Sequence, residues 1–404
     1  MTRLASPDTT ESVDTSGRTI ALALGGFAVM VVLAGTVVAL AYGHPPGREP
    51  FLHGPSWLDG WFQFDSGWYY GIATSGYSFA PGQQSSVAFF PTYPLLVRGL
   101  GWLTGDYQLV GTLVTIAAGA GAIALFAVWA SRLLPARSAR TAVVLLLLYP
   151  YAYFLYGAMY ADALFLLTVV ASFVLLEQRH FWLAGIVGAF ATAGRPVGIA
   201  VAIGLIVRAL ELRAERVAEP ATRVSLRQLA HATRLLRWPE LGVLVSLSGL
   251  GAWCVYLWVT FGNPLAFVAA ESAPGWDQGA GPRTWFKVGF FGHLRHWDAR
   301  VTATLILQAV VCLLAVLLLR RVFRRFGWGY LAFCLVVVAI PLIGTKDFMG
   351  TGRYLLAAFP VMAAAGDWLA STRHTRWLRP VVLTGCAVGV LVGAGLYARG
   401  YELS

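Results

Sequence analysis

A polar and aromatic stretch at residues 63–96 holds the side chains best suited to chemistry in this sequence. It reads QFDSGWYYGIATSGYSFAPGQQSSVAFFPTYPLL and carries one carboxylate, Asp65, soon after a long apolar run. A carboxylate can accept a proton from a reacting hydroxyl group, and aromatic faces can contact a ligand's apolar surface. We therefore interpret residues 63–96 as an active-site loop with Asp65 as its general base.

Further polar side chains occur beside other apolar runs. The cations Arg195, Lys346 and Arg353 are candidates to hold a phosphate group, because charge-assisted hydrogen bonds to phosphate are strong and arginine can make two. The candidate substrate-binding residues are Trp68, Tyr69, Tyr93, Tyr160, Asp162, Asn263 and Glu271. Ionisable groups near lipid are costly and usually mark a site, so their recurrence favours one shared site.

Other residues compete for these roles. Asp59, Asp277 and Asp298 are also acids beside aromatic residues, and each is an alternative general base. His293 and His296 with Asp298 have a loose ligand-like spacing, but ordinary interfacial residues explain it better, and we assign no metal ligand. The chemistry requires no cofactor, and a divalent cation is compatible with it.

The composition is that of a polytopic membrane protein. The 404 residues are 58% hydrophobic and only 12% charged, with a mean hydropathy of +0.67, whereas about a quarter of a soluble domain is charged. The sequence has no P-loop, no G-x-G-x-x-G and no D-x-D motif for a nucleotide. The four cysteines lie inside apolar runs and provide no disulfide framework.

Eleven apolar runs predict membrane spans across about 30 Å of hydrocarbon. They are residues 19–42, 108–131, 141–158, 163–178, 181–194, 197–210, 240–261, 300–320, 328–345, 353–370 and 380–400. Gly194, Arg195 and Pro196 interrupt the region 181–210, and proline breaks a helix, so we expect two short helices there. The alternative is one kinked span, which would invert the membrane orientation of all the spans and loops that follow it.

Basic residues set the expected orientation. With residues 1–18 as a cytoplasmic polar arm, 20 of the 30 Lys and Arg residues fall on the cytoplasmic side, as the positive-inside rule requires. We expect one transmembrane domain at 19–404 in the plasma membrane, with a helical extracytoplasmic catalytic loop at 43–107 and a second outer loop at 262–299. The basic cytoplasmic loop 211–239 would lie against anionic headgroups, and no nucleic-acid motif accompanies it.

Short motifs follow one another along most of the chain. They are FDSGWY at 64–69, GY at 76–77, AFFPTYPLL at 88–96, YADALF at 160–165, GRPVG at 194–198, FGNPLAF at 261–267 and GRYL at 352–355. Their order and spacing resemble the PIG-V family, the GPI mannosyltransferase 2 type, and its bacterial relatives. The resemblance implies an all-helical GT-C glycosyltransferase fold.

This resemblance also implies an activity. The family transfers mannose from a polyprenyl-phosphate-mannose donor with inversion, on the non-cytoplasmic side, and the acceptor here would be an envelope glycolipid, a lipoglycan or another hydroxyl group. The family's loop aspartate matches Asp65, although Phe64 stands where tryptophan is usual. Asp162 stands where the family commonly has a glutamate. Where relatives often show Arg-Ser-Asn, this sequence has GRP at 194–196, and only Arg195 is carried over from that pattern.

Two other classes of function compete with this one. A transporter or flippase of a lipid-linked sugar would be expected to show related halves and ionisable groups near the bilayer midplane. We see no related halves, and the charged residues fall at the outer ends of the expected spans. A non-catalytic subunit of a glycosylation complex would tolerate mutation of the candidate acids.

Overall fold

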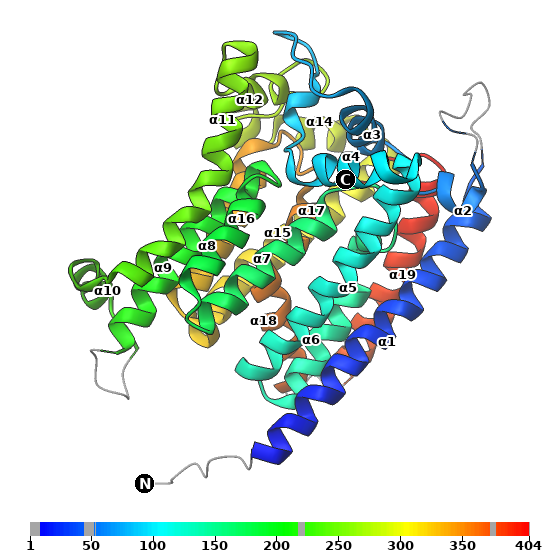
Figure 1. Ribbon diagram of the computed structural model, residues 1–404. Coiled ribbons are helices and arrows are strands. Elements are labelled where there is room, and N and C mark those ends of the chain that lie inside the picture. The colour runs from blue at the N-terminus through cyan, green and yellow to red at the C-terminus, as the bar shows by residue number, and fades with distance from the viewer. Residues whose placement is uncertain (1–8, 44–51, 53, 217–222, 372–376, 404) are drawn as a thin grey trace.

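The computed structural model describes residues 9–43, 52, 54–216, 223–371 and 377–403, and every regular element in these ranges is helical (Figure 1). Five helical segments there are long and apolar enough to cross a membrane. They are α1 (Thr9–Ala41), α5 (Tyr107–Leu133), the continuous pair η5 (Trp238–Leu247) and α11 (Ser248–Phe261), α15 (Ala299–Phe326) and α19 (Leu378–Ala398). The chain is therefore an all-helical, polytopic membrane protein. Residues 1–8 of the expected polar arm lie outside the described ranges.

The remaining helices of the bundle are shorter. They are α6 (Ala136–Leu148), α7 (Asp162–Glu177), α8 (Phe181–Thr192), α9 (Ile199–Glu215), α16 (Trp328–Gly344) and α18 (Phe359–Ser371). At 12 to 17 residues they fall short of the roughly 20 that one crossing needs, so the predicted count of eleven spans is not confirmed.

Helix breaks account for this shortening. The expected span 141–158 divides at Tyr149 and Pro150, where α6 ends before η2 (Ala152–Leu155). The expected span 353–370 divides into α17 (Thr351–Leu356) and α18. The short helices pack against other helices of the bundle, including α7 against α5, α6 against α18 and α9 against α16.

The interruption at residues 194–196 produces a helical hairpin. α8 ends at Thr192, and α9 starts after the short η3 (Pro196–Gly198). Gly188 in α8 packs against Leu205 in α9, where an added Cβ would lie 2.9 Å from the leucine Cδ1. Residues on either side of the break thus lie side by side, which agrees with two short helices and excludes one kinked span.

The two expected outer loops lie at the same end of the bundle. Residues 43–107 include α2 (Ser56–Asp59), α3 (Asp65–Ser75), η1 (Ser86–Ala88) and α4 (Thr92–Thr104), so the predicted helical character of this loop is confirmed. Residues 262–299 include α12 (Ala266–Glu271), α13 (Pro282–Trp285) and α14 (Val288–Arg295). Figure 1 shows α3, α4, α12 and α14 together at the end opposite α10 (Leu226–Ala232).

Candidate active site

The carboxylate of Asp65 is held at the start of α3 by a strained turn. Phe64, which precedes it, has a φ of 48°, in the left-handed region that non-glycine residues rarely adopt. The buried hydroxyl of Tyr160 accepts the Asp65 N–H at 3.1 Å, and that of Tyr397 donates to the Trp61 carbonyl at 3.0 Å. Such strain persists only where the surrounding structure enforces it, and it is common at functional sites.

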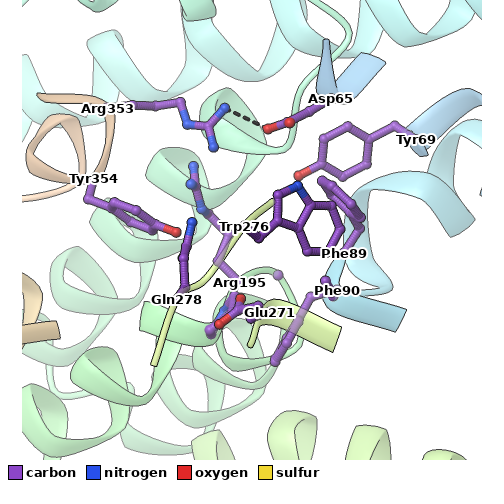
Figure 2. A pocket seen from close by; sticks show the side chains of 13 residues that line it. Asp65, Tyr69, Phe89, Phe90, Arg195, Glu271, Trp276, Gln278, Arg353 and Tyr354 are labelled. Carbon is purple, nitrogen blue, oxygen red and sulfur yellow. Dashed lines mark hydrogen bonds and ion pairs between the residues drawn. The ribbon is translucent and has the colours of Figure 1, made fainter. Parts of the chain in front are cut away.

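Asp65 belongs to a network of four charged side chains. Arg353 Nη1 lies 2.7 Å from Asp65 Oδ2, a contact that Figure 2 marks with a dashed line. Arg195 forms a buried ion pair with Asp162, and Arg353 Nε lies 4.0 Å from Asp162 Oδ1. The four residues come from α3, α7, the break before η3, and α17, so this network exists only in the folded chain.

Part of this network lacks partners. Asp162 Oδ2 and Arg353 Nε are buried without a hydrogen bond to any described residue. Among the described residues, Arg195 makes one hydrogen bond, through Nη1 to Asp162. Buried polar groups are nearly always hydrogen-bonded, so each exception requires an explanation. The arginines here retain donors that a ligand could use.

Aromatic rings fix the orientation of both guanidinium groups. Arg353 lies over the rings of Tyr160 and Phe154, at 5.2 and 5.4 Å from their centroids. Arg195 lies over the ring of Tyr354 at 4.8 Å. Cation–π contacts orient a guanidinium without using its N–H donors. The donors therefore stay available while the planes of the cations are held in place.

The network borders a polar cavity of about 560 Å³, including its open mouth. Its lining residues are Asp65, Tyr69, Ala88, Phe89, Phe90, Gly194, Arg195, Pro196, Glu271, Trp276, Gln278, Arg353 and Tyr354. Figure 2 shows Asp65 and Arg353 on one side and Glu271 on the other. Burial raises the pKa of Glu271 to about 7, although nearby Arg195 opposes this shift. The cavity thus holds two carboxylates: Asp65, which is paired with Arg353, and Glu271, whose pKa is raised by burial.

A second cavity, of about 1120 Å³ including its open mouth, adjoins the first and is mostly apolar. It lies between α4, α8 and the η5–α11 helix, and among the described residues that line it Arg98 alone is charged. Pro91 and Ala193 line this cavity, while their chain neighbours Phe90 and Gly194 line the polar one. The same two chain segments therefore form part of the wall of both cavities.

Five of the residues predicted from the sequence line the polar cavity, namely Asp65, Tyr69, Arg195, Glu271 and Arg353. Other candidates stand behind its wall. Trp68 stacks on Phe89 with ring centroids 5.6 Å apart, and Tyr93 is fully buried and donates to the Gly111 carbonyl at 2.9 Å. Tyr160 and Asp162 contact the other site residues from outside the cavity lining. Tyr160 accepts the Asp65 N–H, and Asp162 pairs with Arg195.

Lys346 and Asn263 lie outside the cavity lining. Lys346 Nζ lies 2.7 Å from Asp277 Oδ2, and this hydrogen bond lowers the pKa of Asp277. The chain's other lysine, Lys287, donates to the Thr345 carbonyl at 2.6 Å, so both lysines hold residues 262–299 against the end of α16. Asn263 Oδ1 accepts the backbone N–H of Leu265 at 2.9 Å.

The alternative acids have structural partners elsewhere. Asp59 is buried and accepts a hydrogen bond from Gln108 at 3.0 Å, and Asp298 caps the N-terminus of α15. Asp277 pairs with Lys346, as described above. In the described parts of the chain, no group of three His, Cys, Asp or Glu side chains is arranged to hold a metal ion, and this includes His293 and His296 with Asp298.

Two polar lining residues, Tyr354 and Gln278, were missed by the sequence-based assignment. Tyr354 directly follows Arg353 in the GRYL motif, so the motif itself was an available signal. Gln278 comes two residues after Trp276 in an irregular segment, and nothing in the sequence marks it. It reaches the cavity because the 262–299 segment folds back over the α16 end.

Comparisons with known proteins give only distant similarities. No protein-family profile and no curated protein matches this sequence. The oligosaccharyltransferase of Archaeoglobus fulgidus in its apo form has a TM-score of 0.45 at 12% identity, over 93% of this chain and 56% of that chain. Its complex with zinc and sulfate gives 0.47 at 14% identity, over 92% and 53%. The archaeal enzyme bound to an inhibitory peptide and a dolichol-phosphate gives 0.42 at 14% identity, over 92% and 55%.

This chain therefore spans about half the length of those oligosaccharyltransferase chains. The three TM-scores are below 0.5, so these similarities carry no inference about function.

Proposed function

We propose that this chain is an inverting, membrane-embedded mannosyltransferase of the GT-C type, which uses a polyprenyl-phosphate-mannose donor. The observation that carries this proposal is the contact between the Asp65 carboxylate and the Arg353 guanidinium at the wall of one cavity. A proton acceptor and a cation with unused donors stand next to each other there. Transfer of a sugar from a phosphate requires both.

The proposed transfer forms one bond and breaks one at the anomeric carbon of the sugar. The acceptor's hydroxyl oxygen forms a bond to the anomeric carbon of mannose, and its proton passes to Asp65. The bond from that carbon to the phosphate oxygen breaks, and the electron pair leaves with the polyprenyl phosphate. Arg195 and Arg353 stabilise the phosphate as its charge grows, because fixed donors aimed at developing charge lower the barrier. A divalent cation is compatible with this scheme, and no residue is assigned to hold one.

The contact between Arg353 and Asp65 suggests how the donor prepares the base. While the guanidinium bonds Asp65 Oδ2, it occupies a carboxylate oxygen that would otherwise accept the acceptor's proton. A donor phosphate would compete for the same N–H groups, since phosphate oxygens are strong acceptors. Movement of Arg353 toward the phosphate would leave Asp65 free to accept the acceptor's proton.

A lipid-linked donor is supported by the neighbouring apolar cavity. Phe90 and Gly194 face the polar cavity, and Pro91 and Ala193 face the apolar one, so one ligand could reach both. Such a ligand would have a charged head near Arg195 and a hydrocarbon chain between α4, α8 and α11. A polyprenyl phosphate sugar has this division of polarity.

The aromatic wall supports a sugar as the transferred group. Tyr69, Phe89 and Trp276 line the polar cavity beside Asp65 (Figure 2), and aromatic faces suit the apolar C–H side of a sugar ring. Mannose itself is inferred from the motif resemblance. The eleven crossings are inferred from the apolar runs, and an extracytoplasmic site in the plasma membrane from the distribution of basic residues together with the resemblance. The acceptor would be an envelope glycolipid, a lipoglycan or another hydroxyl group.

The test is donor turnover by the purified full chain in detergent or nanodiscs. Polyprenyl-phosphate-mannose with labelled mannose is supplied with and without a glycolipid extract, and free polyprenyl phosphate and labelled glycolipid are measured. We expect release that depends on the acceptor extract, together with label in a glycolipid. Movement of intact donor across vesicles without release would instead identify a transporter, and absence of both would contradict the enzyme assignment.

A further inference from the structure

A third cavity, of about 690 Å³ including its open mouth, lies at the other end of the bundle from the candidate active site. It is formed where α9 ends, where α15 meets α16, and where the chain resumes at residues 223–224. α9 starts beside the active-site break and ends at this cavity, so the two sites are separated by the length of that helix. None of its lining residues takes part in the proposed sugar transfer.

The described residues that line the cavity have an excess of positive charge. They include four arginines, Arg208, Arg223, Arg324 and Arg325, and two acids, Glu211 and Glu215. Both acids already bond Arg208, at 2.9 and 2.7 Å.

The charges of the other arginines are less fully compensated. Arg325 pairs with Asp367 at 2.9 Å. Arg223 and Arg324 have no carboxylate partner among the residues that the structure describes. Two cations at the cavity are therefore free to bind an anion.

Contacts around Arg223 show that this part of the cavity is ordered. Its guanidinium lies 5.4 Å from the centroid of the Phe323 ring and donates to the Arg324 carbonyl. The neighbouring Val224 carbonyl accepts the indole N–H of Trp328 at 2.7 Å. These contacts join residues 223–224, just before α10, to the junction of α15 and α16. Arg223 is thus held in position at the cavity, beside Arg324.

The remaining lining is apolar, and its position corresponds to a membrane surface. Leu133, Phe323, Phe326 and Trp328 add hydrocarbon and aromatic surface to the lining that the arginines share. α15 is long and apolar enough to cross a membrane and ends in a basic run at residues 320–325. Basic and aromatic residues at the end of a span mark the level of the lipid headgroups.

We infer that this cavity binds the headgroup of an anionic phospholipid, with Arg223 and Arg324 on the phosphate. Arginine suits phosphate because its planar fork can donate two parallel hydrogen bonds. The apolar wall would contact the first carbons of the acyl chains. A lipid headgroup is favoured over a soluble anion because arginines and apolar side chains line the same cavity, next to the basic end of a membrane-length helix.

The test measures lipid retention, which is independent of transferase activity. The full chain is reconstituted in nanodiscs of phosphatidylcholine with phosphatidylglycerol and extracted in mild detergent, and bound phospholipids are quantified by native mass spectrometry. We expect phosphatidylglycerol to be retained in preference to phosphatidylcholine. Arg324→Gln should lower this retention about fivefold, and adding Arg223→Gln about fivefold again, from roughly 1 kcal/mol per basic residue at an anionic surface.

The controls separate charge from folding. Arg227→Gln on α10 removes an exposed cation that does not line the cavity, and it should leave retention unchanged. Arg324→Lys should keep most of it, because the charge remains. Arg324 makes no side-chain bond to another described residue, so its replacement is not expected to disturb folding.

Three outcomes would overturn the inference. One is equal retention by Arg324→Gln and the wild type, and another is equal retention of phosphatidylcholine and phosphatidylglycerol. The third is stabilisation of the wild type by inorganic phosphate alone, to the same extent as by phosphatidylglycerol, because this would identify a soluble anion site.

Discussion

Two clusters of charged side chains lie at opposite ends of the helix bundle, and they differ in how completely they are paired. At one end, all three guanidinium nitrogens of Arg208 bond carboxylates, at 2.7 to 3.2 Å from Glu177, Glu211 and Glu215. At the other end, Arg353 makes one hydrogen bond, to Asp65, within the described chain, and its Nε has no hydrogen-bond partner there.

The difference separates a structural cluster from a candidate catalytic one. Glu211 also accepts the backbone N–H groups of Trp328 and Gly329, so the Arg208 cluster caps the start of α16. The Asp65 cluster leaves buried groups unpaired beside a cavity and follows a strained residue, Phe64. Unpaired buried groups cost stability, and such costs are typical of sites where a ligand completes the bonding.

Among substitutions in the two clusters, we expect the largest effect from Asp65→Asn, which should lose transfer activity. The amide preserves the shape of the side chain but cannot accept the acceptor's proton, so turnover should fall by about 10²- to 10⁴-fold. The assay is polyprenyl phosphate release, with a melting curve to show that the variant is folded. Asp298→Asn, which alters a cap outside the cavity, should keep normal turnover. Near-normal turnover in Asp65→Asn would remove Asp65 as the base.

Breaking the other cluster should instead reduce stability. Arg208→Met leaves Glu177 and Glu211 without their cation, and removal of one partner from a buried ion pair costs about 3–5 kcal/mol. We expect a markedly lower melting temperature in detergent for this variant. Arg227→Gln, at an exposed position, should change stability by less than about 0.5 kcal/mol. Equal melting temperatures for these two variants would show that the Arg208 cluster has no structural role.

A smaller effect is expected when the shape of the site cation changes but its charge remains. Arg353→Lys loses the planar fork, and one hydrogen bond to a charged group is worth about 1.5–3 kcal/mol, or about tenfold to hundredfold in kcat/KM. The measurement is the donor dependence of transfer. Arg325→Lys, at the opposite end, is the matched control and should behave as the wild type does. An unchanged kcat/KM in Arg353→Lys would place the phosphate elsewhere.

The smallest expected effect is a pH dependence of stability arising from Glu271. Its pKa is about 7 in the folded chain, compared with an ordinary value of 4.5, so the folded state holds a proton that the unfolded state releases. This contribution to stability is complete below pH 4.5 and is lost as the pH rises to 7.

The pH test uses melting temperatures between pH 4.5 and 8. Glu271→Gln should have a flatter profile than the wild type, with a higher melting temperature at pH 8 and a similar one at pH 4.5. A variant profile parallel to that of the wild type would show that Glu271 does not titrate in this range.

The long spans were predictable from local composition, and the short helices were not. The expected spans at 108–131 and 300–320 correspond to α5 and α15, because a long apolar run with few charges has few alternatives to a membrane helix. The expected spans at 141–158 and 353–370 divide into shorter elements. Hydropathy averages over a window, so it does not register where a helix ends inside an apolar region.

The candidate site was predictable in part. Asp65, Arg195 and Arg353 were expected on one face, and the structure brings them to one cavity. Lys346 was expected there for the same reason, yet it pairs with Asp277. Its distance along the sequence from Arg353 is only seven residues, and the turn between α16 and α17 directs the two cations to different partners.

By itself the sequence determined that this chain is helical and membrane-spanning and that Asp65 stands in a polar loop, because hydropathy, proline breaks and motif spacing are local properties. Only the tertiary structure decided which charges pair. Asp65 pairs with Arg353, 288 residues away, and Asp162 pairs with Arg195. Arg208 is fully paired with carboxylates. Partner choice among buried charges depends on the path of the whole chain, since each charge pairs with whatever the fold brings within a few ångströms.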